Sequence, residues 1–190
     1  SFGIVDFTRG ELGTRGTPEL RIEESFSAAE ILGAIFRYNL GLEDGIFQIN
    51  QMSLNLLVQN IRKTKPKIIL ANALVDRHPD HGRGAHLVRE ASFLAGLQKY
   101  RSTFDFVLQE AWKVNTVLHY IQDYTHVPEV IIDITPHIDK KMEAILCFSS
   151  QFYNPQSQEP ISAISSKEFL ESVRGKSAIM GRYIQVAYGE

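Results

Sequence analysis

Short β-rich runs alternate with helix-forming segments along most of this chain, and this alternation constrains its fold more than any other feature. The predicted strands are residues 2–7, 36–40, 67–72, 116–121, 129–134 and 183–188. The apolar periodicity of residues 51–64 predicts a helix between the second and the third of them. Strands that alternate with helices form a mostly parallel sheet covered on both faces. We therefore expect an α/β fold, a Rossmann-like three-layer sandwich.

Helix starts are marked by capping residues. Thr17 followed by Pro18 predicts an N-cap and a first helical residue, with Ile22, Phe26 and Ala29 on the buried face. Residues 165–168 match a capping box for the last helix.

Length and charge exclude several classes of protein. The 190 residues fit one domain, 1–190, and a net charge of −2 argues against a nucleic-acid binder. No apolar run approaches the roughly 20 residues of a membrane helix. The single cysteine, Cys147, favours a reducing compartment, so we expect a cytoplasmic protein with no membrane or nucleic-acid partner.

A polar loop with glycines at 10, 13 and 16 follows the first predicted strand and precedes a helix. This context suits phosphate binding, although neither G-x-G-x-x-G nor a P-loop motif occurs. Arg21 and Arg77 belong to loops or helix starts at the predicted carboxyl edge of the sheet, where guanidinium groups would suit a substrate with carboxylates. Ordinary surface ion pairs are the alternative.

The richest loop is Asp76–Gly84, which holds two histidines, two aspartates and two arginines in nine residues. One imidazole of such a loop can bind a metal while the other faces a reacting oxygen, and a carboxylate can fix a ring tautomer. A solvated helix start, in which Asp80 only complements the helix dipole, is the alternative.

Four segments resemble the LmbE-like metal-dependent de-N-acetylases: DFTRGELGTRGTPELR (6–21), DRHPDHGRGAHLV (76–88), VIIDIT (130–135) and KKMEAILCFSSQFY (140–153). They occur in family order, and the branch they most resemble is N-acetylglucosaminyl-L-malate deacetylase of bacillithiol biosynthesis.

This resemblance implies a hydrolase in which zinc, or another divalent metal, activates water that attacks the N-acetyl group of a glucosamine conjugate. It implies that His81 binds the metal, that His78 stabilises the oxyanion or protonates the amine, and that Asp80 orients His78. It places Arg21 and Arg77 near the substrate, where they would bind the carboxylates of the sugar conjugate.

The sequence departs from the family pattern at its start, because the A-H-P-D-D motif that carries two metal ligands and the general base does not occur. Residues 2–7 resemble the second strand of the family, so the first strand is expected to be missing and the domain truncated at both ends. Three readings stay open: this deacetylase, a deacetylase of another N-acetylglucosamine conjugate, and a non-catalytic nucleotide- or anion-binding module. A homo-oligomer is compatible with each.

Overall fold

The computed structural model describes residues 1–190, and the chain forms two compact units. The first comprises Ser1–Asp44 and Pro128–Glu190, and the second comprises Gly45–Val127. The expectation of a single domain stays a prediction. None of the helices combines the length and the apolar character that a membrane span requires.

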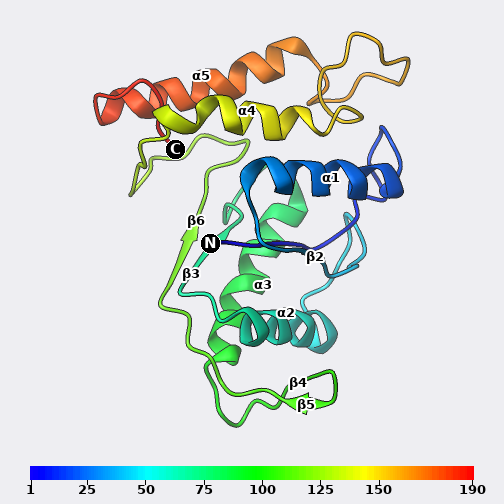
Figure 1. The fold of residues 1–190 in the computed structure, drawn as a ribbon, viewed down its shortest axis with the longest axis vertical. Helices are drawn as coiled ribbons and strands as arrows, with labels where there is room; N and C mark the ends of the chain where they lie inside the picture. The colour runs from blue at the N-terminus through cyan, green and yellow to red at the C-terminus, as the bar shows by residue number, and fades with distance from the viewer. The chain divides into compact units, whose positions relative to one another are not determined.

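The first unit pairs two strands in parallel and adds three helices (Figure 1). Its elements are β1 (Ile4–Asp6), α1 (Pro18–Leu32), β2 (Arg37–Asn39), a 3-10 turn (Thr135–His137), α4 (Ile138–Leu146) and α5 (Lys167–Tyr183). As predicted, Thr17 caps α1 by accepting a hydrogen bond from the Leu20 amide, and Pro18 is the first helical residue. Helix α1 packs against α4, which buries Ile138 and Met142.

The second unit also contains a parallel pair, β3 with β6, and its core lies between α2 and α3. Its elements are α2 (Gln51–Thr64), β3 (Ile68–Ala71), α3 (Pro79–Ala95), β4 (Thr103–Phe104), β5 (Val107–Leu108) and β6 (Thr116–His119). The predicted helix at 51–64 is confirmed residue for residue, and it begins at a capping box in which Asn50 and Ser53 bond each other's backbone. Leu57, Val58 and Leu87 are buried where the two helices meet.

The predicted α/β class and the parallel strand pairing are confirmed, but two predicted strands are wrong. Residues 129–134 form only an isolated antiparallel bridge from Asp133 to Gly189, with backbone hydrogen bonds that join Ile132 to Glu190 and Ile134 to Tyr188. The predicted strand at 183–188 does not form, because α5 continues to Tyr183 and the chain then turns through residues 184–187, with Gln185 at a positive φ of 59°.

Three smaller expectations also need correction. The N-cap of α5 is Ser166, one residue later than predicted. Phe26 is exposed, because α1 turns Glu24, Ala28 and Ala29 inward instead. The continuous apolar run at 67–72 predicts a strand buried on both faces, but Ile68 and Leu70 of β3 are exposed, since α3 covers the face to which their neighbours point.

Candidate active site

The loop between β3 and α3 brings both histidines of the DRHPDHGRG segment together. His78 is the N-cap of α3, Pro79 is its first residue, and His81 follows within the first turn. The two imidazole rings lie 5.2 Å apart between centroids, so they face the same small volume. The structure therefore places His78 and His81 side by side, as a shared site requires.

A buried carboxylate holds His81 from behind. Oδ2 of Asp76 lies 2.5 Å from Nδ1 of His81, and the Asp76 side chain is 0% exposed, whereas that of His81 is 30% exposed. The carboxylate can only accept, so Nδ1 carries the proton, and in a neutral ring Nε2 then keeps a free lone pair. This is the arrangement of a metal-binding histidine with a carboxylate partner.

The charge of Asp76 is fixed by the backbone around it. Burial alone would raise its pKa, but hydrogen bonds from the Tyr124 amide, the His81 ring and the amides of Arg77 and Asp123 lower the pKa to about 2. Asp76 is thus an anion at any physiological pH. A fixed anion favours the Nδ1–H form of His81.

His78 has the opposite proton arrangement. Its Nδ1 accepts a hydrogen bond of 3.2 Å from the Asp80 backbone amide, so a neutral ring carries its proton on Nε2. One ring of the pair therefore offers a lone pair at Nε2 and the other an N–H donor. The first suits a metal ion and the second suits a developing oxyanion.

The carboxylate of Asp80 does not contact His78. It accepts from the Gly45 amide at 2.6 Å and pairs with Arg83 at 2.6 Å. Arg83 also donates to the carbonyl oxygens of Gly45 and Phe47. Asp80 thus fastens the start of α3 to residues 45–47, and it is the Asp80 backbone amide that orients the imidazole of His78.

Residues 119–126, which begin at the end of β6, scaffold almost the whole β3–α3 loop, and sequence reasoning missed this. His119 Nδ1 lies 2.7 Å from the carbonyl oxygen of Asn72, and Gln122 accepts from Asn72 and from the Ala73 amide. The amides of Asp123 and Tyr124 bond Asp76. The only available signal was the position of this segment after a strand expected in the same sheet.

Arg77 is also tied to this segment, since its Nε bonds the carboxylate of Asp123. Its side chain is 48% exposed, and the contact with Asp123 uses only Nε of the guanidinium group. A substrate carboxylate would therefore share Arg77 with Asp123.

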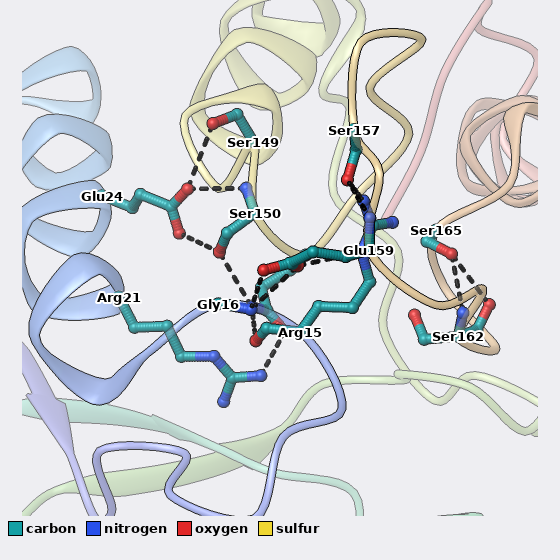
Figure 2. A network of polar contacts seen from close by, with 11 residues as sticks. Arg15, Gly16, Arg21, Glu24, Ser149, Ser150, Ser157, Glu159, Ser162 and Ser165 are labelled. Carbon is teal, nitrogen blue, oxygen red and sulfur yellow. Dashed lines mark hydrogen bonds and ion pairs between the residues drawn. The ribbon is translucent and has the colours of Figure 1, made fainter.

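Arg21 lies in the first unit, inside the polar network of Figure 2. It donates to the carbonyl oxygen of Gly10 at 2.9 Å and to Oε1 of Gln151. The glycine loop is built around this side chain, because a Cβ at Gly10 or Gly13 would overlap its guanidinium group. In this structure the loop thus encloses an arginine.

Comparisons with known proteins show the family to which the chain belongs. Residues 1–92 match the sequence profile of the family PIG-L: GlcNAc-PI de-N-acetylase. The conserved protein TT1542 of Thermus thermophilus has a crystal structure that is 33% identical, with a TM-score of 0.87 over 100% of this chain and 79% of that one. The chain belongs to the PIG-L family, which is LmbE-like.

Two further PIG-L relatives are named diacetylchitobiose deacetylases. That of Thermococcus kodakarensis is 29% identical over 79% of this chain and 56% of its own length. The structure of the Pyrococcus horikoshii N,N′-diacetylchitobiose deacetylase, complexed with an inhibitor, is 26% identical with a TM-score of 0.79, over 98% of this chain and 70% of that one.

Another relative is named as a hydratase and not as a deacetylase. A 4-oxalmesaconate hydratase of Pseudomonas putida is 28% identical over 75% of this chain and 55% of its own length. The chain therefore spans about half the length of the curated relatives it matches. The stretch that matches the PIG-L profile contains Arg21, Arg77, His78, Asp80 and His81, whereas Asp123 and Gln151 lie beyond it.

One of these residues could bind a metal ion, but the side chains of a complete metal site are not brought together. His81, with Nδ1 on a buried carboxylate and Nε2 free, has the arrangement of one zinc ligand. No group of three His, Cys, Asp or Glu side chains converges in a way that could hold a metal ion. Catalytic zinc sites take three protein ligands, so His81 could supply at most one of them and the residues described do not complete such a site.

Proposed function

We propose that this PIG-L protein is a hydrolase that removes the acetyl group from the nitrogen of an N-acetylglucosamine conjugate. The observation that carries the proposal is the pair of histidines with opposite proton arrangements, His81 with Nε2 free and His78 with Nε2 as a donor. The two relatives named as deacetylases support the same chemistry.

His78 would act on the reacting amide. When water adds to the carbonyl carbon, negative charge develops on the amide oxygen, and an N–H donor facing that oxygen stabilises it. The attacking water supplies the proton that the nitrogen gains as the carbon–nitrogen bond breaks, so that acetate and a free amine result, while the neutral ring of His78 keeps its own proton and acts as a hydrogen-bond donor. Asp80 would support this by holding Nδ1 of His78 through its backbone amide.

A divalent metal, zinc in the first instance, is part of this proposal, and His81 would be one of its ligands. Such a metal supplies an activated water when bound. His81 and Asp76 would contribute the orientation of one ligand.

The proposed substrate is N-acetylglucosaminyl-L-malate. Arg21 of the first unit and Arg77 of the second each support this choice, because a guanidinium group with unused donors suits a carboxylate such as those of malate. A different N-acetylglucosamine conjugate, such as diacetylchitobiose, is the nearest alternative.

The test is an assay of acetate release by the protein on N-acetylglucosaminyl-L-malate and on diacetylchitobiose, together with a measurement of bound zinc. His78→Ala should lower turnover by roughly 10²–10³-fold with the zinc content unchanged. His81→Ala should lower the zinc content itself.

The matched control is His86→Ala, on an exposed position of the same helix, which should match the wild type in both readouts. Equal zinc content and equal activity loss in the two site variants would contradict the assignment of roles.

Hydration of a carbon–carbon double bond is a second candidate, favoured by the relative named as a hydratase. A donor such as His78 would serve that reaction as well. Loss of absorbance from an unsaturated dicarboxylate, without release of acetate from either sugar substrate, would support hydration over deacetylation.

A further inference from the structure

Arg21 differs from the other arginines of the first unit in the kind of group that holds it. Arg15 pairs with Glu159 and Arg37 pairs with Asp6, so both have a carboxylate partner. The partners of Arg21 are two uncharged oxygens, the Gly10 carbonyl and Oε1 of Gln151. Its Nε is buried and has no hydrogen-bond partner. The positive charge of Arg21 is therefore held in place without being neutralised.

The glycine loop makes room for this guanidinium group. A Cβ on Gly10 would lie 1.6 Å from one terminal nitrogen of Arg21, and a Cβ on Gly13 would lie 2.1 Å from the other. No side chain could occupy either position unless Arg21 moved. An arginine carries five N–H donors, and the two uncharged partners use two of them, which leaves three.

Gln151 is oriented so that its oxygen must face Arg21. Its Nε2 donates to the carbonyl oxygen of Arg15 at 2.6 Å and to Oγ of Ser150 at 2.8 Å, and its side chain is buried. Both hydrogens of the amide are thus used on the side away from Arg21.

Ser150 is in turn fixed by Glu24, which is buried and accepts from both the amide and the hydroxyl of Ser150 at 2.7 Å (Figure 2). Ser149 donates to the same carboxylate at 3.2 Å. The charge of Glu24 is therefore used by serines, and it forms no ion pair with Arg21. In this network the carboxylate of Glu24 faces the serines, and the amide oxygen of Gln151 faces Arg21.

We infer that Gln151 is a specificity-determining positioning residue: it holds the Arg21 guanidinium without neutralising it, so that the remaining donors bind an anionic group of the substrate. The chemical class of that group is a carboxylate or a phosphate, which accepts from the fork of an arginine. This inference rests on the proposed function, in which Arg21 binds the substrate.

The decisive variant is Gln151→Glu, which replaces the uncharged partner by a carboxylate. Binding by the full chain is measured by calorimetry for N-acetylglucosaminyl-L-malate and for the uncharged methyl glycoside of N-acetylglucosamine. We expect the variant to bind the malate conjugate at least ten-fold more weakly and the methyl glycoside within two-fold of the wild type. Gln156→Glu adds the same charge at an exposed position between Gln151 and Glu159 and should leave both affinities unchanged.

Gly13→Ala is the second variant, because its new Cβ displaces the same guanidinium group without adding charge. It should reproduce the selective loss of the malate conjugate. On the wild type, the Nε–H resonance of Arg21, assigned with Arg21→Lys, should shift when L-malate is added. That measurement needs no variant of Gln151.

Equal weakening of both ligands, or no weakening, in Gln151→Glu and Gly13→Ala would overturn the inference, and so would an Arg21 resonance that malate leaves in place. Failure of the proposed function is a separate result. In that case the protein prefers the malate conjugate through Arg21 and Gln151 but releases no acetate from it.

Discussion

His78 and His81 lie three residues apart, and the group next to each ring gives it a different proton position. His81 faces a buried carboxylate, and His78 faces a backbone amide that opens its own helix. The first neighbour requires a proton on Nδ1, and the second requires that Nδ1 be free. In their neutral forms, the two rings thus present one nitrogen lone pair and one N–H donor from the start of a single helix.

This proton arrangement can be measured directly. Long-range proton–nitrogen spectra, recorded at a pH at which both rings are neutral, should show His81 as the Nδ1–H form and His78 as the Nε2–H form. Asp76→Asn should leave His78 as it is and return His81 towards a mixture, because the amide lacks the charge that favours Nδ1–H. Asp139→Asn, at an exposed position, should change neither ring. Spectra in which His81 keeps its form in Asp76→Asn would refute the role given to Asp76.

Cys147 allows a second prediction at this scale. Burial, and then the nearby negative charges of Glu143 and Glu24, raise the pKa of its thiol above the ordinary value. The thiolate is the reactive form, so at pH 8 the folded protein should react with a thiol reagent more slowly than the urea-unfolded chain does. A folded rate equal to or above the unfolded one would contradict this.

The DRHPDHGRG segment could be found from sequence because its reactive residue types are concentrated in one loop. Asp123 and Gln151 could not be found in this way. Asp123 is 46 residues from its partner Arg77, and Gln151 is 130 residues from its partner Arg21. Nothing in the local pattern around either residue indicates that partner.

At the scale of elements, the helices followed their sequence signals more closely than the strands did. Caps and apolar periodicity act within one segment, and they predicted the start of α1 and both ends of α2 correctly. A strand depends on what lies beside it, so the run at 129–134 forms no ladder despite its β-rich composition. The β4–β5 hairpin was missed because its turn residues with positive φ are Asp105 and Phe106, with no glycine to mark the turn.

Arg62 holds two helices of the second unit together. It is 3% exposed and donates from α2 to carbonyl oxygens at the end of α3, including those of Ala95 at 3.1 Å and Leu97 at 2.8 Å. The last carbonyls of a helix have no partner within the helix, so this fork serves as their cap.

Arg62→Lys should therefore destabilise the protein although the charge is kept. Lysine has three donors at one point and cannot span the same oxygens, so we expect a loss of roughly 2–4 kcal/mol in the free energy of unfolding. Urea denaturation measures it. Arg89→Lys, on an exposed position of α3, should change stability by less than about 0.5 kcal/mol. Equal stability of the two variants would show that the contacts of Arg62 contribute nothing.

At the scale of the whole molecule, the chain folds its first unit from two separated stretches and its second from the residues between them. Alternating strands and helices indicated the α/β class and the parallel pairing, because both follow from element order. They did not indicate which segments would share a unit. That division depends on contacts such as those of Glu24 with Ser150, which join residues 126 positions apart.

The acid stability of the molecule follows from Asp76. Its pKa is about 2 in the folded protein, below the value of about 3.9 for a free aspartate. A group with a lowered pKa stabilises the fold fully above the unfolded value and loses that contribution as the pH falls towards the folded value. Asp76 should therefore contribute about 2 kcal/mol near neutral pH, and this contribution should fade between about pH 4 and pH 2.

Trp112 reports on this loss, because it is the only tryptophan and lies in the same unit as Asp76. Urea unfolding followed by its fluorescence should give a free energy that falls between pH 4 and pH 2, and Asp76→Asn should flatten that fall by removing the group that titrates. Asp105→Asn, at the exposed turn of the hairpin, removes a carboxyl group from the same unit and should keep the wild-type slope. If the slope of Asp76→Asn matches that of the wild type, the low pKa is not what the hydrogen bonds around Asp76 produce, and the anchoring of His81 by a permanent anion fails with it.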